Sequence, residues 1–141
     1  MSDTEARKLM LTNQLAELDR LAPWLQHRSD LKLSDDTSLA IQVCLEEAIA
    51  NIVMYGAVED ERRIEISVEL NSAAGILVAQ IEDNGQEFDP TQTPSLTVAS
   101  SLADAKPGKV GIHLMRSFSD EMTYLRDSDR NHLTLRFVRS Q

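Results

Sequence analysis

One segment of strict apolar–polar alternation constrains the fold of this chain most strongly. Residues 63–70 contain the run IEISVEL, in which four aliphatic side chains face one way and polar side chains the other. Such alternation is typical of a strand with one buried face. A second apolar segment over residues 76–82 follows the turn sequence NSAAG, so we expect an antiparallel hairpin with a longer loop. One face of this hairpin needs an apolar layer to cover it.

A helix with a long apolar stripe is expected just before the hairpin. Ser34 is suited to cap its N-terminus, and the helix is expected to end near residues 55–56. The stripe at helical spacing consists of Ile41, Leu45, Ala48, Ile49 and Ile52.

The remaining segments complete an α/β pattern. Residues 7–11 read as a strand, and a helix is expected from about residue 14, with an interruption at Pro23. Near the C-terminus, apolar residues at helical spacing precede the strand-like runs MTYLR and HLTLRFV. The spaced residues are Gly111, Met115, Phe118 and Met122, and we expect Met115 and Phe118 to be buried in the core. We therefore predict a single domain over 1–141, a two-layer α/β sandwich whose mixed, mostly antiparallel sheet of about five strands carries helices on one face.

Composition excludes several classes of protein. With 14 Lys and Arg against 23 Asp and Glu, the formal charge is −9, and such a surface repels phosphate backbones and anionic lipids. We expect no direct nucleic-acid binding and no attachment to membranes. Cys44 is the only cysteine, which excludes a disulfide framework. No leader and no segment of membrane-spanning length is expected, so the protein is predicted to be cytoplasmic.

The first candidate site lies on the long helix. Glu47 and Asn51 are four residues apart, so they point the same way, one turn from each other. A carboxylate can take a proton from a hydroxyl group, and an amide oxygen suits Mg²⁺. The alternative is that both are polar flanks of an amphipathic helix.

Two further candidate segments contain glycine. Asp83 could accept a hydrogen bond from the exocyclic amine of a purine, and Gly85 would let a flat ring approach the backbone; the alternative is an ordinary turn. Gly108 and Gly111 precede a helix, whose free N–H groups can bind phosphate; here the alternative is a flexible loop. Residues 89–109 are rich in turn residues and lack periodicity, which indicates a functional or mobile loop.

The order of these segments resembles a known ATP site. The strings LEEAIANIVMYG, VAQIEDNGQEFDP and GKVGIHLMRSFSDEMTYLRDSDRNHLTLRF are similar to the N box and the two G boxes of the superfamily of gyrase, histidine-kinase and mismatch-repair ATPases. Within it the chain resembles the anti-sigma factor serine/threonine kinases of bacterial partner-switching systems. The likeness spans roughly residues 9–138.

This resemblance implies roles for the candidate residues. Glu47 would be the general base, Asn51 the Mg²⁺ ligand, Asp83 the adenine-binding residue, and Gly85 would lie under the base. Residues 89–109 would form a lid over ATP. The segment framing the phosphates would consist of Gly108, Lys109, Val110, Gly111 and Ile112.

The resemblance also implies partners. An antagonist protein would be phosphorylated on serine, a sigma factor would be held, and the kinase would form a homodimer near its N-terminal strand. The alternative is a noncatalytic nucleotide-binding module that sequesters a regulatory partner. The chain departs from the family pattern at Lys109, where many relatives have a second glycine, and at Asn131 and His132, where some have Gly-Thr.

Overall fold

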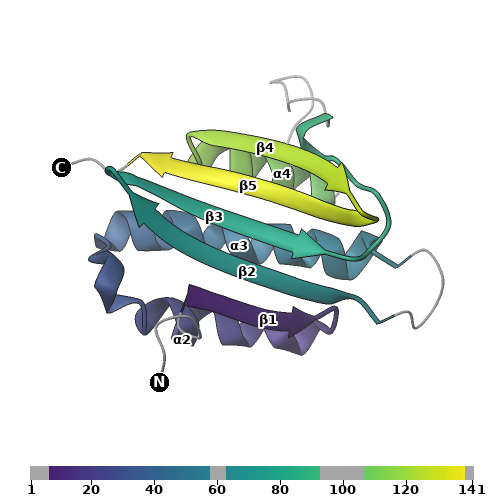
Figure 1. Ribbon diagram of the computed structural model, residues 1–141, viewed down its shortest axis with the longest axis horizontal. Coiled ribbons are helices and arrows are strands. Elements are labelled where there is room, and N and C mark those ends of the chain that lie inside the picture. Colours follow the sequence, from purple (N-terminus) through teal and green to yellow (C-terminus); the bar gives the residue numbers. More distant parts are fainter. Residues whose placement is uncertain (1–6, 58–62, 93–106, 139–141) are drawn as a thin grey trace.

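The protein folds into two layers, a sheet and a set of helices that cover one of its faces (Figure 1). The computed structural model describes residues 7–57, 63–92 and 107–138. The larger helices are α2 (Leu21–Gln26), α3 (Asp35–Tyr55) and α4 (Pro107–Phe118), and short 3-10 turns occur at η1 (Leu15–Arg20), η2 (Ser29–Leu31) and η3 (Pro90–Gln92). This confirms the predicted α/β sandwich.

The sheet has five strands in the order β1-β2-β3-β5-β4. Their bounds are β1 Lys8–Thr12, β2 Glu65–Ala73, β3 Ile76–Asp83, β4 Glu121–Asp127 and β5 Arg130–Val138. All four pairings are antiparallel, so the described sheet contains none of the parallel pairs that a mixed sheet would have. Because β5 inserts between β3 and β4, the end of β3 lies beside the start of β5.

The hairpin of β2 and β3 is tighter than the sequence suggested. Ala73 pairs with Ile76, so only Ala74 and Gly75 form the turn, and both have positive φ (51° and 80°). This backbone geometry suits the right-handed twist of a hairpin. The expected longer loop is therefore wrong, because β2 continues through most of NSAAG.

Helix α3 forms the centre of the core. Its cap is confirmed, since Ser34 Oγ accepts a hydrogen bond from the Thr37 backbone N–H. Its buried apolar residues pack with the inward-facing side chains of β2 and β3 in one cluster. By length and composition α3 is long and apolar enough to cross a bilayer, contrary to our expectation, but its apolar face is buried against the sheet as in the core helix of a soluble domain.

The N-terminal helix is interrupted, although not at Pro23. A 3-10 turn runs to Arg20 and α2 starts at Leu21, which places Pro23 in the first turn, where no backbone N–H donor is needed. The buried Arg28 follows this helix and ties it to the sheet, since its Nη1 donates to Leu70 O at 2.7 Å. It also pairs with Asp30.

Two expectations near the C-terminus are wrong. Met122 lies in strand β4 rather than on the preceding helix, and Phe118 is 42% exposed rather than buried. Helix α4 begins at Pro107, so Gly108 and Lys109 belong to its first turn. Of the predicted lid, residues 93–106 lie outside the described residues.

Candidate active site

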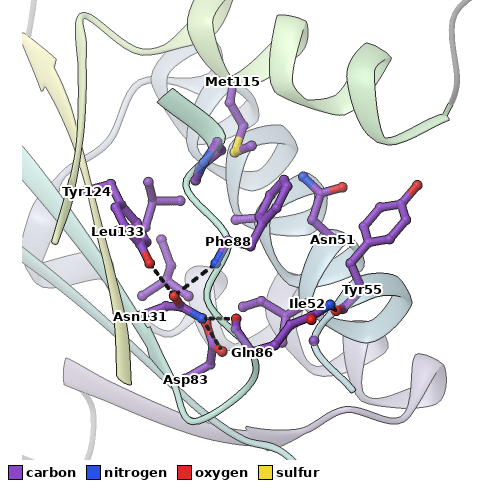
Figure 2. Close-up of a pocket in the computed structure, with 14 residues that line it drawn as sticks. Asn51, Ile52, Tyr55, Asp83, Gln86, Phe88, Met115, Tyr124, Asn131 and Leu133 are labelled. Atoms are coloured by element: carbon purple, nitrogen blue, oxygen red, sulfur yellow. Dashed lines mark hydrogen bonds between the residues drawn. The ribbon is translucent and has the colours of Figure 1, made fainter. Parts of the chain in front are cut away.

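A cavity lies where β3 ends, between α3, the loop after β3 and strands β4 and β5 (Figure 2). The empty space between its walls, including the open mouth, is about 450 Å³. Its lining is mostly apolar, with Ile52, Ile81, Met115 and Leu133 among its walls. Its polar side chains include Asn51, Asp83 and Asn131. An apolar cleft with a few convergent polar groups is typical of a small-molecule site.

Asp83 is the buried carboxylate of this cavity and is only 4% exposed. Its Oδ1 accepts hydrogen bonds from the Gly85 backbone N–H at 2.8 Å and from Asn131 Nδ2 at 3.0 Å. Burial raises the pKa of Asp83, while these two hydrogen bonds and the charge of Arg126 oppose the rise. The geometry provides a fixed hydrogen-bond acceptor at one end of the cavity.

Gly85 is needed for close packing of the loop after β3. A Cβ at this position would lie 2.9 Å from Asp83 Oδ1 and 2.9 Å from the backbone oxygen of Gly56. The loop is also held by the Gln86 N–H, which donates to Gly56 O at 2.8 Å. The glycine therefore lets the loop approach the end of α3, and its place under a purine ring stays a prediction.

Asn51 lies on α3 and faces the same cavity (Figure 2). It is 4% exposed, and its buried Nδ2 has no hydrogen-bond partner among the residues that the structure describes. An unpartnered buried amide costs about 1–3 kcal/mol. A bound ligand with a hydrogen-bond acceptor would supply a partner for this nitrogen, so the site fits a polar ligand.

Glu47 lies one helical turn before Asn51 and contacts α4. A Cβ at Gly111 would come within 2.3 Å of Glu47 Oε2, so the glycine makes room for the carboxylate. Burial, reinforced by the charge of Glu46, raises the pKa of Glu47. A carboxylate with a raised pKa is better suited to accept a proton near neutral pH. Glu46 points elsewhere and accepts a hydrogen bond from Gln42.

The predicted phosphate segment lies at the start of α4. The first-turn N–H groups of a helix have no acceptors within that helix, and Pro107 has no N–H. The backbone N–H groups of Gly108 and Lys109 are therefore the candidate phosphate donors in the described part of this segment. Gly111 and Ile112 lie beyond the first turn, and Ile112 belongs to the core. The role of Gly108, Lys109, Val110, Gly111 and Ile112 in binding phosphate stays a prediction.

Sequence reasoning missed several residues of the cavity. Tyr55 and Phe88 both line it, with ring centroids 6.2 Å apart and planes 29° apart. Asn131 was noted only as a departure from the family pattern, although it bonds directly to Asp83. Its inward position on β5 was open to prediction, because the side chains of a strand alternate between faces.

Magnesium fits this site only with help from a ligand. Among the described residues no group of three or more His, Cys, Asp or Glu side chains could hold a metal ion. Mg²⁺ is commonly held by one or two protein oxygens together with phosphate oxygens and water. The amide oxygen of Asn51 is a donor of the required type.

Comparison with known proteins places this site in a family. The family model for the histidine kinase-like ATPase domain matches residues 11–137, and this chain belongs to that family. The superfamily expected from the sequence is thus confirmed, and the chain is an ATP-binding domain of kinase type.

One relative and one solved structure are similar to this chain. The serine/threonine-protein kinase BtrW of Bordetella bronchiseptica (strain ATCC BAA-588 / NCTC 13252 / RB50) is 37% identical over 116 residues, which cover 79% of each chain. The histidine kinase domain of the Erythrobacter litoralis EL346 blue-light activated histidine kinase matches with a TM-score of 0.55 at 13% identity. That match covers 88% of this chain and 60% of the other, and it supports the fold alone.

Proposed function

We propose that this protein is an ATP-dependent serine kinase that acts as an anti-sigma factor. It would phosphorylate a serine of an antagonist protein and thereby control which partner is bound. The serine/threonine-protein kinase among its relatives supports this reaction class. The observation that carries the proposal is the arrangement of Glu47 and Asn51, one turn apart on α3. Asn51 Nδ2 lies in the cavity that Asp83 also lines and has no partner in the described part of the chain.

Each end of the cavity would hold one part of ATP. Asp83 would accept a hydrogen bond from the adenine amine, and the apolar walls would contact the ring. Asn51 would bind Mg²⁺ and the phosphates, and the first-turn amides of α4 at Gly108 and Lys109 would bind the phosphate tail. When bound, ATP with Mg²⁺ supplies the phosphoryl group and the positive charge that neutralises it.

Glu47 would act on the protein substrate. Its carboxylate lies against Gly111, one turn into α4 from the proposed phosphate end, and its raised pKa suits it to accept the proton of a serine hydroxyl. The hydroxyl oxygen becomes a better nucleophile as that proton leaves. The role of this chain is therefore to orient the groups and move one proton.

The proposed partners extend this function. An antagonist with an acceptor serine, a sigma factor and a second copy of this chain are the partners that we infer, in the cytoplasm. Strand β1 lies at the edge of the sheet and pairs only with β2 among the described strands. A second chain that paired with β1 would compete with Glu17, which accepts from the Thr12 N–H, and with Arg20, which donates to Met10 O. Sedimentation of the purified protein tests the homodimer.

A phosphotransfer assay tests the proposed reaction. The protein is incubated with labelled ATP, Mg²⁺ and the antagonist from the neighbouring genes, and phosphoserine is identified by mass spectrometry. Glu47→Gln should abolish transfer, whereas the matched variant Glu46→Gln should retain it. If the protein binds ATP but transfers no phosphate under any condition, it is a noncatalytic binding module and the kinase proposal is wrong.

A further inference from the structure

Asn131 lies behind Asp83 at the centre of a polar network. It is the register partner of Asp83 across β3 and β5 and is only 6% exposed. Its Nδ2 donates to Asp83 Oδ1 at 3.0 Å and to the backbone oxygen of Gln86 at 2.8 Å. Since an amide nitrogen carries two hydrogens, these bonds use its full donor capacity.

The other end of the same amide fixes its orientation (Figure 2). Asn131 Oδ1 accepts from the Tyr124 hydroxyl at 2.5 Å, from the Phe88 backbone N–H at 3.3 Å and from Arg126 Nη1 at 3.2 Å. A reversed amide would place its oxygen against Asp83 and its N–H groups against the Arg126 donor and the Phe88 N–H. The network therefore permits one orientation of Asn131.

This orientation determines which oxygen of Asp83 remains available. Oδ1 is occupied by Asn131 and Gly85, and among the described residues no hydrogen bond to Oδ2 is found. Burial and the charge of Glu82 raise the pKa of Asp83, whereas Asn131, Gly85 and Arg126 lower it. Asn131 thus stabilises the ionised form of Asp83 and also holds its carboxylate in one orientation.

We propose that Asn131 is a positioning residue that sets the base preference of the site, because it holds Asp83 so that Oδ2 accepts a hydrogen bond from a 6-amino purine. This inference rests on the proposed function, since it requires that a purine nucleotide bind in the cavity. A 6-oxo purine lacks the amine and carries a donor at N1 instead, which is displaced along the edge of the ring. A carboxylate held in one position binds the 6-amino purine more tightly than the 6-oxo purine, whereas a mobile carboxylate can turn to accept a hydrogen bond from the donor of either base.

The test compares two nucleotides that differ at position 6 of the base. The dissociation constants of ATP and ITP, each with Mg²⁺, are measured by calorimetry for the wild type and for Asn131→Ala. The variant frees Asp83 Oδ1, so the preference for ATP over ITP should fall by about tenfold, mainly through weaker ATP binding. A purely structural defect would weaken both nucleotides by the same factor.

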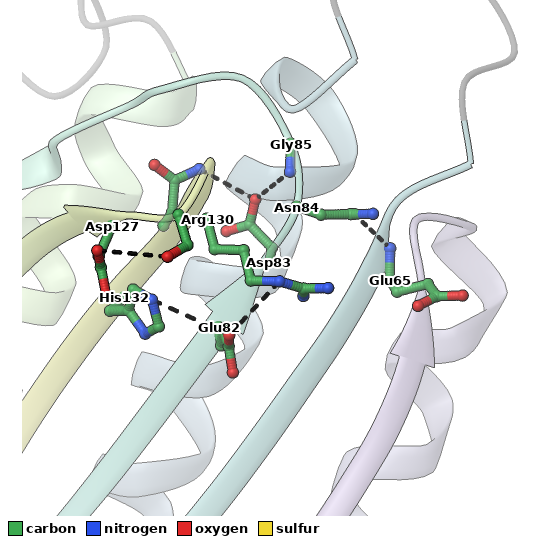
Figure 3. Close-up of polar contacts among 10 residues, drawn as sticks. Glu65, Glu82, Asp83, Asn84, Gly85, Asp127, Arg130 and His132 are labelled. Carbon is green, nitrogen blue, oxygen red and sulfur yellow. Dashed lines mark hydrogen bonds and ion pairs between the residues drawn. The ribbon is translucent and has the colours of Figure 1, made fainter.

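A matched control lies on the next residue of β5. His132 points to the opposite face of the sheet, where its ring lies 3.9 Å from Glu82 (Figure 3). His132→Ala should leave the ATP to ITP ratio at the wild-type value.

A second variant keeps the test available if Asn131→Ala does not fold. Asn131→Asp has the same size and places a second carboxylate against Asp83 Oδ1. The two carboxylates repel each other unless they share a proton, so Asp83 is no longer held as an ionised acceptor in one position. Its preference for ATP over ITP should fall as in Asn131→Ala. If folded variants keep the wild-type ratio, or lose both nucleotides equally, the role of Asn131 is refuted while ATP binding stands. A wild type that binds neither nucleotide would instead refute the proposed function and this inference with it.

Discussion

Replacing Asn51 by leucine should make the free protein more stable and its nucleotide site inactive. The buried Asn51 Nδ2 has no hydrogen-bond partner within residues 7–57, 63–92 and 107–138, and removing an unpartnered buried polar group recovers about 1–3 kcal/mol. Leucine has a similar volume and would meet the apolar wall formed by Ala48 and Ile52. For a domain of this size, such a gain corresponds to a rise in melting temperature of roughly 3–10 °C.

The same substitution should remove stabilisation by ATP. A ligand at a hundred times its dissociation constant stabilises the folded state by about 2.7 kcal/mol, so ATP with Mg²⁺ should raise the melting temperature of the wild type. Asn51→Leu should start from a higher value and show little further rise. If Asn51→Leu stabilises the free protein and abolishes ATP binding, Asn51 serves the ligand and not the stability of the fold.

Thermal melts with and without ATP and Mg²⁺ measure both effects. Asn71→Leu is the matched control, because Asn71 lies on β2 outside the cavity and donates to Glu69; it should keep the wild-type response to ATP. If Asn51→Leu lowers the melting temperature of the free protein, or still responds fully to ATP, our interpretation of the unpartnered amide is wrong.

Three other substitutions test the remaining groups. Gly111→Ala would push the Glu47 carboxylate aside, since the new Cβ falls 2.3 Å from Oε2. The rate of phosphotransfer should fall about 10²- to 10⁴-fold with little change in ATP affinity. An unchanged turnover rate would show that Glu47 is not the general base. Glu47 must be deprotonated to accept a proton, so activity should be lost as the pH falls through its raised pKa. Glu46→Gln removes the neighbouring negative charge and should move this loss of activity to lower pH. If the loss of activity stays at the same pH, another group is titrating. Asp83→Ala removes a hydrogen bond to a charged acceptor and should weaken ATP binding about ten- to a hundredfold by calorimetry; undiminished affinity would rule out the adenine assignment.

The strand pattern and the long helix were predictable because each is a local property of the sequence. The alternation over residues 64–70 and the stripe from Ile41 to Ile52 both mark faces that must be buried, and the structure buries them. The turn of the hairpin was harder to predict, because Ala74 adopts a positive φ, which is uncommon for alanine. Phe118 kept the helical period of a core residue but lies at the exposed end of α4.

The candidate site was predictable where chemistry and spacing coincide within one segment. Glu47 and Asn51 share one helix, so their common direction follows from helix geometry alone. The network around Asn131 depends on β5 pairing with β3, a contact between residues 48 positions apart. The close approach of Gly111 to Glu47 likewise depends on how α3 and α4 pack, which the spacing of residues within one segment does not predict.

A structure of the protein with a nonhydrolysable ATP analogue and Mg²⁺ tests the assignment of the cavity most directly. We predict that the adenine amine lies within hydrogen-bond distance of Asp83, that the metal is bound by Asn51, and that the phosphates extend toward the start of α4. A nucleotide bound on another surface, with the cavity beside Asp83 still lined as in the free protein, would contradict the proposed function.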